Sequence, residues 1–538
     1  MPMISLPRRG FLGLASAGIA TLAAPSHGAG LGLGFTHDVA SGEPSATSVL
    51  VWTRYVGRSG PVRLTVEVSE LPDFARVAGG GTVAASAERD HTAKLVVDGL
   101  TPGRWYFYRF VAPDGNVSPT GRTRTLPVGE TAQFNLGIFS CSNLPFGFFN
   151  AYGHAAARDD LDLALHLGDY LYEYRRGTYP LAAVAGRQVE PASETVHLAD
   201  YRARYAAYRR DPDLRALHRR LPMIAMWDDH ESANDSWEGG AENHDPATEG
   251  PWQARKAAAV RAYREWMPVS DSDWAEYRIG DLAVLFRPEE RLDARTRQVD
   301  LAAAIGNGAD LAAALKTFRD GPWQDPAHTL FGPAQERWFA DRMRAAARET
   351  RWQVLAQQVN MGITHMPPAA LDWLPPGGGD RARDFIRAGI AAGAIGLPFN
   401  MDSWNGYPAA RSRVLRNGLD ADANLVVLSG DSHNAWAFDL AEQGVAAGVE
   451  FGGHSVTSPG FEAELGGADP LAVARGLVGA SPELKWAETS RRGYMTVRLT
   501  QDRADAEWLF LDTVLKPSRT IAARHAAGVA RGARRLTS

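Results

Sequence analysis

Four short apolar runs, each ending abruptly in polar side chains, constrain the fold of this chain more than any other feature. They are FNLGIFSCSN (134–143), LALHLGDYLYE (163–173), LPMIAMWDDHE (221–231) and NLVVLSGDSHNAW (424–436). Continuous apolar runs of this length are typical of parallel strands covered on both faces. In α/β proteins, sites form beyond the carboxyl ends of such strands. The pattern therefore predicts an α/β protein whose polar strand endings meet at one place.

The length and the net charge of the chain limit its possible domain number and binding partners. With 538 residues the chain is long enough for two domains, and its net charge of −5 is too small to point to nucleic acid or an anionic membrane surface. Short β-branched and aromatic runs separated by Gly/Pro turns predict a small immunoglobulin- or fibronectin-like β-sandwich at 35–126. Strands alternating with helices then predict an α/β domain at 134–515.

Several elements of the α/β domain are predicted individually. Helices are expected at 201–218 and 333–349, and a single strand at 278–286. The runs 494–500 and 505–514 are expected to form an antiparallel pair that closes a sheet edge, and the tail after 519 to be helical or frayed. Tyr201, Tyr205 and Tyr208 recur at helical spacing, and we interpret them as packing residues rather than as a cofactor-binding stripe.

The first 29 residues resemble an export signal. Arg8-Arg9 precede an uncharged, small-residue-rich run at 11–24, which is too short for a stable membrane span and matches the twin-arginine type. We therefore expect a periplasmic or extracellular protein, with the twin-arginine machinery as a partner. No other segment has the length and hydrophobicity of a spanning helix.

Cys141 is the only cysteine, so an intramolecular disulfide is impossible. A free cysteine often serves as a small buried apolar residue. Here it follows a strand-like run and is flanked by Ser140, Ser142 and Asn143. This position favours the alternative, a thiolate that binds a metal ion.

The second run ends in Asp169 and Tyr172. Gly168 permits a tight turn that exposes Asp169 at the strand end, where its two oxygens can bridge two cations. If one helical turn follows, the phenol of Tyr172 returns over the same point, and phenolate suits a trivalent metal. The alternative is that Asp169 caps a helix.

The third run ends in Asp228, Asp229, His230 and Glu231. Such a set is costly at the end of an apolar strand unless the charges are paired or bound to metal. One carboxylate is expected to bind metal, the other to orient ligands, and His230 to donate a proton to the leaving oxygen. Asn234 is a further oxygen ligand candidate, and a surface acidic turn is the alternative.

The fourth run supplies Asp431 and His433, which in an extended chain would face the same side. A lone histidine is more often structural, but a neighbouring aspartate at a strand end favours a ligand. Two cations near one bridging aspartate would hold a phosphoryl group and activate water. Sulfur, nitrogen and phenolate ligands would select a transition metal on one side, and oxygen ligands a calcium-like ion on the other.

The order of these motifs resembles the secreted PhoD-type alkaline phosphatases, a branch of the calcineurin-like metallophosphoesterases. The resemblance also runs through HDVASGEPSATSVLVWTR (37–54), WQVLAQQV (352–359), FNMDSWNGYPAAR (399–411), SVTSPGFE (455–462) and the two C-terminal strands. It implies a layered αββα catalytic domain and ferric iron near Cys141, Asp169, Tyr172 and His433. It also implies calcium near Asp169, Asp431 and either Asp229 or Asn234, with the choice left open. The expected catalytic residues are His230, Asp229 and Asn143.

One segment departs from the family pattern. Members often carry Leu-Asp-Thr-Arg after the strand that we place at 278–286, whereas this chain reads Phe286-Arg287-Pro288-Glu289-Glu290-Arg291. An arginine that faces the substrate is therefore Arg291, Arg295 or Arg297, or is absent.

The resemblance implies an exported phosphatase that cleaves phosphate monoesters, diesters or both through attack by metal-bound hydroxide. Two alternatives stay open. One is a dedicated phosphodiesterase or phospholipase of the same fold, and the other is an exported binding protein without turnover, against which the intact ligand set argues.

Overall fold

A computed structural model describes residues 32–305, 310–374 and 380–537, and the predicted export signal lies outside these ranges. Two large sheets face each other at the centre of the molecule. In spatial order, the nine-stranded sheet contains β20 (Ile521–Ala530), β19 (Arg503–Leu511), β18 (Gly493–Thr500), β8 (Gln133–Phe139), β9 (Leu163–His166), β10 (Met223–Ala225), β1 (Gly34–Gly42), β2 (Val49–Val56) and β5 (Thr92–Val97). The seven-stranded sheet contains β11 (Ala275–Ile279), β12 (Ala283–Arg287), β13 (Trp352–Ala356), β14 (Leu425–Ser429), β16 (Val445–Gly452), β15 (Ala435–Glu442) and β17 (Leu484–Glu488).

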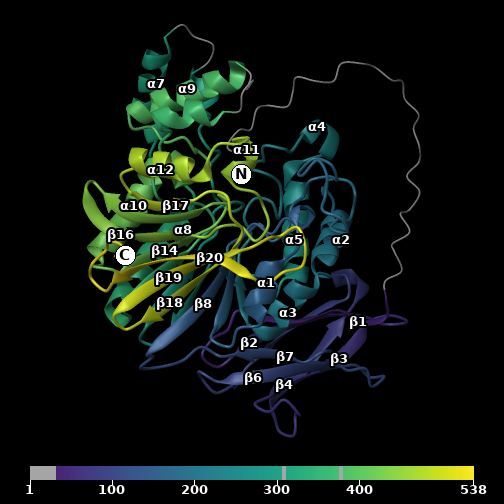
Figure 1. Cartoon of the computed structure of the whole chain (residues 1–538). Helices are drawn as coiled ribbons and strands as arrows, with labels where there is room; N and C mark the ends of the chain where they lie inside the picture. The colour runs from purple at the N-terminus through teal and green to yellow at the C-terminus, as the bar shows by residue number, and fades with distance from the viewer. Residues whose placement is uncertain (1–31, 306–309, 375–379, 538) are drawn as a thin grey trace, which may run out of the picture.

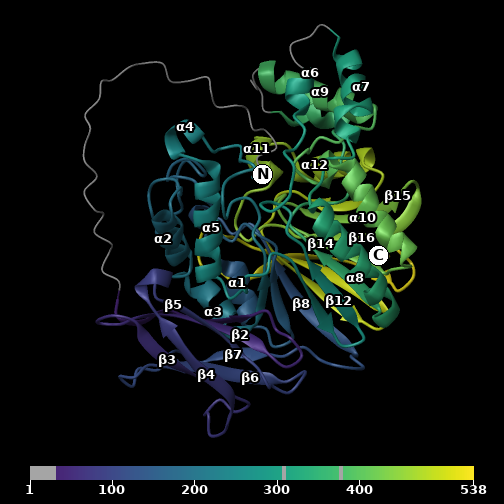
Figure 2. The ribbon, with the colours of Figure 1, turned by 180° about the vertical axis from the view of Figure 1, so that it is seen from behind.

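Helices cover the outer face of each sheet (Figures 1 and 2). The first layer consists of α1 (Asn150–Ala156), α2 (Leu198–Tyr208), α3 (Pro212–Arg220) and α5 (Trp252–Trp266), with the short α4 (Pro246–Glu249) beside it. The second consists of α8 (Gly332–Glu349), α10 (Pro408–Asp420), α12 (Pro470–Ala480) and the short α11 (Phe461–Glu464). The apolar runs of the sequence fill the space between the sheets, where Ile138 and Leu165 of one sheet share a core with Val354 and Leu428 of the other.

The predicted αββα arrangement after a β-sandwich is therefore confirmed. A third sheet, of β4 (Val77–Ala85), β3 (Val62–Ser69), β6 (Trp105–Val111) and β7 (Gly121–Arg124), packs on β1, β2 and β5 to form the sandwich. At the opposite end of the molecule, α6 (Leu301–Ile305), α7 (Leu311–Asp320) and α9 (Asp380–Ala394) enclose a small apolar core of their own (Figures 1 and 2).

The sandwich and the catalytic layers share one sheet. β1 runs parallel to β10, with Gly42 opposite Met223, so that β1, β2 and β5 extend the sheet that carries β8, β9 and β10. A Cβ atom at Gly42 would lie 2.1 Å from the carbonyl oxygen of Pro268, so only glycine permits this approach. The indole of Trp52 in β2 donates to the carbonyl of Glu265 in α5 at 2.8 Å.

Three predicted elements are wrong. The tail after 519 forms strand β20, so the β18–β19 pair lies inside the sheet, because nine-residue pairing with β19 outweighs the low strand propensity of an Arg/Ala-rich segment. The segment 278–286 contains a turn that joins β11 to β12 as a hairpin. The helix at 201–218 is two helices, because Asp211 caps a new helix that begins at Pro212.

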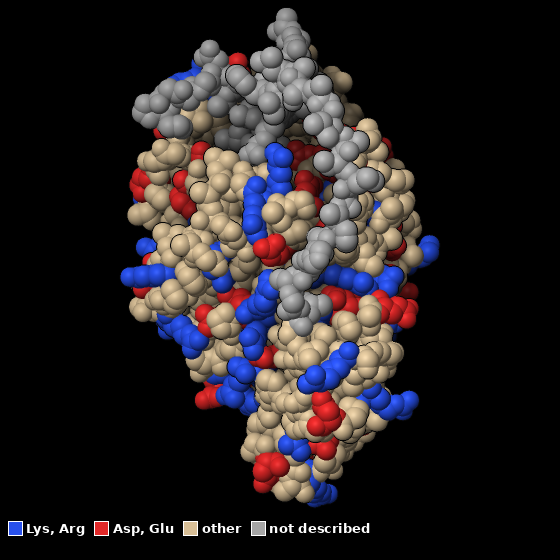
Figure 3. All heavy atoms as spheres, turned by 90° about the vertical axis from the view of Figure 1, so that its right-hand side faces the viewer, with Lys and Arg blue, Asp and Glu red and all other residues tan. Residues whose placement is uncertain are grey.

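On the face shown in Figure 3, basic and acidic side chains are interspersed. Among the described residues, no helix combines the length and the apolar character that crossing a membrane requires.

Candidate metal centre

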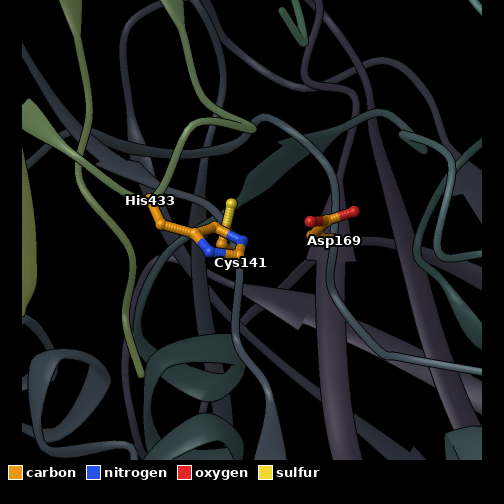
Figure 4. Close-up of side chains that lie close together, drawn as sticks. All are labelled: Cys141, Asp169 and His433. Carbon is orange, nitrogen blue, oxygen red and sulfur yellow. The ribbon is translucent and has the colours of Figure 1, made fainter. Parts of the chain in front are cut away.

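The four polar strand endings meet at one place. β8, β9 and β10 are parallel neighbours in one sheet, and β14 brings its ending from the facing sheet. Three groups of potential ligands result: Cys141, Asp169 and His433; Asp169, Asp229 and His230; and Asp228, Asp229 and Asp431. Within each group the ligand atoms lie within 4.8 Å of one another, and all the residues are buried. Figure 4 shows the side chains of the first group close together.

Four of these residues have left-handed backbone. The φ angles are 56° at Cys141, 55° at Asp169, 60° at Asp431 and 62° at His433. Such angles are uncommon for residues other than glycine and are found preferentially at functional sites. The expected extended geometry of Asp431 and His433 is therefore wrong, although their side chains do reach the cluster. Residues 169–172 are not helical either, and a loop rather than a helical turn returns Tyr172 to Asp169.

Tyr172 connects the members of the first group. Its hydroxyl lies 2.9 Å from Oδ2 of Asp169 and 3.0 Å from Nε2 of His433. Nδ1 of His433 lies 2.8 Å from the carbonyl oxygen of Pro459, which can only accept, so Nδ1 carries the proton and Nε2 presents a lone pair. The phenol of Tyr172 therefore has one proton for two acceptors, Oδ2 of Asp169 and Nε2 of His433. A cation in place of this proton could bind both acceptors and the phenolate oxygen.

The burial of ionisable side chains at this place also indicates a bound cation. Burial raises the pKa of Asp169 to about 7, with Asp229 and Asp431 adding to the effect. Burial, assisted by Asp169, also raises the pKa of Cys141 and of Tyr172 well above their usual values. A bound cation reverses this tendency and stabilises the anionic forms. The residues present therefore fit a metal ion of the kind that sulfur, nitrogen, phenolate and carboxylate ligands hold.

Arg291 lies against the acidic group. It is fully buried, with Nε donating to Asp228 at 2.5 Å and Nη1 donating to Asp402 at 2.7 Å. Its Nη2 atom lies 3.7 Å from Oδ1 of Asp431 and 4.0 Å from Oδ1 of Asp229, and has no hydrogen-bond partner among the described residues.

The other two arginine candidates point elsewhere. Arg295 donates to the carbonyl oxygen of Asp402 at 2.7 Å, and Arg297 stacks over Trp237 at 5.0 Å. Of the three, Arg291 is the one with an unpaired donor beside the cluster.

His230 is held by a carboxylate that the sequence analysis did not select. Nδ1 of His230 lies 2.7 Å from Oε2 of Glu173, so Nε2 is the ring nitrogen that Glu173 does not engage. Burial opposes protonation, but Asp229, Glu173 and Asp169 outweigh it and raise the pKa of His230 well above its usual value. Glu173 thus fixes the orientation of the ring, which the expected role of His230 as a proton donor requires.

The two candidate amides differ in their surroundings. The side-chain oxygen of Asn234 accepts from the hydroxyl of Tyr174 at 3.0 Å, and its backbone N–H donates to Glu173 at 2.9 Å. Asn234 thus supports the loop, and Asp229 stands in two of the three groups of histidine, cysteine and acidic side chains. Asn143 is fully buried, and neither atom of its amide has a hydrogen-bond partner among the described residues.

Further supporting residues escaped the sequence analysis. Glu231 accepts from the backbone N–H groups of Asp169 at 3.1 Å, Tyr170 at 2.6 Å and Asp228 at 2.8 Å, and so joins two strand endings. Glu231 belongs to the polar ending of the third apolar run. Sequence spacing alone cannot show that its carboxylate accepts from backbone N–H groups rather than binding a metal.

Helix α2 holds the backbone of Tyr172. The hydroxyl of Tyr208 accepts from the N–H groups of Leu144 and Tyr172, both at 3.2 Å, and Arg204 donates to the carbonyl of Tyr172. The tyrosine stripe therefore does more than pack, since Tyr208 positions a candidate ligand. Tyr205, in the same stripe, has no hydrogen-bond partner for its hydroxyl among the described residues.

Comparison with known proteins gives consistent similarities. Residues 136–508 match the family model described as PhoD-like phosphatase, and residues 23–127 match that of its N-terminal domain. The chain is 31% identical over 515 residues to alkaline phosphatase D of Bacillus subtilis (strain 168), covering 91% of this chain and 80% of the relative.

Two solved structures are similar. That of PhoD aligns with a TM-score of 0.76 at 28% identity, covering 94% of this chain and 92% of the other. A purple acid phosphatase, PPD1, from yellow lupin (Lupinus luteus) seeds aligns with a TM-score of 0.52 at 10% identity, covering 91% and 73% of the two chains, which indicates a shared fold alone.

Proposed function

Since the chain belongs to the PhoD-like phosphatase family and is a phosphoester hydrolase, we propose that it cleaves phosphate monoesters, diesters or both at a centre that binds ferric iron and calcium. The observation that carries the proposal is the buried group of Cys141, Asp169 and His433 with the hydroxyl of Tyr172 between the last two. These four residues would hold the iron. Asp169, Asp229 and Asp431 would hold the calcium, an assignment supported by Asp229, which stands in one group with Asp169 and in another with Asp431.

When bound, the metals supply Lewis acidity for the phosphoryl group and lower the pKa of water. The residues of the chain do the rest. Nη2 of Arg291 is placed to bind a phosphoryl oxygen, and its partners Asp228 and Asp402 hold the guanidinium in position. The unpartnered amide of Asn143 offers a further donor. Nε2 of His230 donates the proton to the leaving oxygen, while Glu173 fixes the orientation of the ring.

The deciding experiment combines metal analysis with paired assays. Protein purified without refolding is analysed for iron and calcium, and assayed with p-nitrophenyl phosphate and bis-p-nitrophenyl phosphate. We expect both metals and hydrolysis of at least one ester, and hydrolysis of the diester alone would identify a dedicated phosphodiesterase. If Cys141→Ala kept full iron and full activity, the metal assignment would be wrong.

We further propose that the protein is exported by the twin-arginine route. The support is the sequence around Arg8-Arg9 and the uncharged run that follows. Replacing both arginines by lysine should leave the protein in the cytoplasmic fraction, as read by immunoblotting of cell fractions. Undiminished export of this variant would contradict the proposal.

A further inference from the structure

A cavity of about 360 Å³ borders the metal centre. Its wall is formed mainly by the loop that follows β9 and includes Asn143, Pro145, Tyr172, Tyr174, Tyr179 and Leu181. The volume is within the range of pockets that take small organic molecules. Leu181 is 83% exposed and adds apolar surface to the cavity.

Two observations connect the cavity to the reaction. Tyr172, the candidate ligand, and Asn143, whose buried amide has no partner among the described residues, both line it. The rings of Tyr172 and Tyr174, which also line it, lie 4.2 Å and 5.2 Å from the ring of His230. The cavity therefore adjoins the aromatic rings that pack against His230, the expected proton donor to the leaving oxygen.

The chemistry of the wall favours an uncharged ligand. Tyr179 packs edge-on against Phe146 at 4.7 Å and Tyr174 at 5.7 Å, giving a wall of aromatic rings. Two of the three arginines at the cavity are engaged elsewhere: Arg176 donates to Glu190 and to the carbonyl of Val189, and Arg204 to backbone carbonyls. The third, Arg175, donates to the hydroxyl of Thr178 at 3.3 Å. What faces the cavity is thus mostly aromatic and aliphatic surface.

We propose that this cavity is a leaving-group subsite, which receives the aromatic or bulky apolar alcohol of the phosphoester. The inference rests on the proposed function, because it places the ester oxygen between the metal centre and His230. It adds a substrate class, namely phosphoesters of aryl-bearing alcohols in preference to those of small alcohols. Aromatic walls bind such groups by apolar contact and ring stacking.

The test compares 2-naphthylmethyl phosphate with methyl phosphate, and follows the release of inorganic phosphate. Both are esters of primary alcohols, so the comparison isolates the size and aromaticity of the leaving group. Ala183→Trp fills the cavity from an exposed position on its wall, and Ala185→Trp, on the same loop but outside the wall, is the matched control. Leu181→Asp tests the apolar wall independently.

We expect wild-type protein to prefer the naphthylmethyl ester, and Ala183→Trp and Leu181→Asp to lower kcat/KM for it by about tenfold or more. Values for methyl phosphate and the inhibition constant of inorganic phosphate should stay within about twofold, and Ala185→Trp should change neither ester. Equal losses for both esters, or none, would overturn the subsite.

Calorimetric binding of 2-naphthylmethyl phosphonate against methyl phosphonate, which cannot be hydrolysed, repeats the comparison without turnover. If wild-type protein cleaved no phosphoester yet bound the naphthylmethyl phosphonate more tightly, with the preference lost in Ala183→Trp, the proposed function would fail, and the cavity would stand as a binding site for aryl groups without a leaving-group role.

Discussion

Individual residues at the metal centre are held in geometries that the chain alone does not favour. Cys141, Asp169, Asp431 and His433 all have left-handed backbone, which costs on the order of 1–3 kcal/mol per residue when the surroundings do not impose it. Glu231 and the carbonyl of Pro459 are among the groups that hold these segments. The site therefore depends as much on its supporting contacts as on its ligands.

The first prediction concerns Cys141. Cys141→Ser keeps the size of the side chain but replaces a soft ligand, so we expect iron content to fall strongly and activity to fall by more than about a hundredfold. Elemental analysis and the p-nitrophenyl assay measure the two effects, and circular dichroism checks the fold. Since Ser142 donates to backbone at 2.9 Å and binds no candidate metal, Ser142→Ala is the control that should retain iron. Equal iron in both variants would contradict the assignment.

The second prediction concerns proton transfer. His230→Gln should lower kcat by about 10²- to 10⁴-fold, and Glu173→Gln, which weakens the support of the ring, by less. Because a good leaving group needs little protonation, both losses should be larger for methyl phosphate than for p-nitrophenyl phosphate. Equal losses for the two esters would mean that His230 does not protonate the leaving oxygen.

Among the elements, α2 has the role that was hardest to predict from the sequence. Tyr208 and Arg204, one turn apart, hold the N–H and the carbonyl of Tyr172, so one helix face fixes a candidate ligand through its backbone. Spacing identified the tyrosines as one stripe, but it could not separate Tyr208, whose hydroxyl accepts two bonds, from Tyr205, whose hydroxyl has no partner among the described residues.

The third prediction compares Tyr208 with Tyr205. Tyr208→Phe leaves two buried N–H groups without their acceptor, so we expect a loss of about 1–3 kcal/mol in unfolding free energy and weaker retention of iron. Tyr205→Phe, in the same helix and equally buried, should change neither. Urea denaturation and dialysis against a chelator measure the two quantities. Identical behaviour of the variants would show that α2 merely packs.

Strand endings were the most predictable elements and connecting segments the least. Apolar runs followed by polar residues located β8, β9, β10 and β14, because burial on both faces leaves a clear pattern. The return of Tyr172 to Asp169 was anticipated for the wrong reason, because a loop and not a helical turn produces it. β20 was missed, because its pairing with β19 is a tertiary effect that local composition does not record.

At the scale of the whole molecule, the sandwich and the catalytic layers are joined by backbone pairing. The fourth prediction is that they unfold together, in a single calorimetric transition, because β1 continues the sheet of β10 and Trp52 bonds to α5. A chain that begins at residue 128 should be insoluble or should lose activity. Two separate transitions, or a stable and active fragment, would show that the shared sheet is dispensable.

The fifth prediction concerns acid stability. Burial lowers the pKa of His454 to about 3, below the value of about 6.5 in unfolded chains, so the unfolded state takes up the proton first. His454 thus destabilises the folded state increasingly as the pH falls below 6.5. Between pH 7 and pH 5 the unfolding free energy of His454→Asn should rise relative to wild type by about 2 kcal/mol. Comparing the two proteins cancels the titration of the site carboxylates, and a pH-independent difference would contradict the prediction.

The nine-stranded sheet also sets an order for synthesis. Strand β8, next to the centre of the sheet, pairs with β18, and Arg498 of β18 donates to Gln133 of β8 across a sequence separation of 365 residues. The ion pair of Asp38 and Arg215 spans 177 residues. A ribosome therefore releases most of the chain before the sheet acquires its last strands, and pairing at such separation is slow to form. An incomplete chain would expose unpaired strand edges and would lack a complete active site. We therefore expect folding of this protein during synthesis to require chaperones.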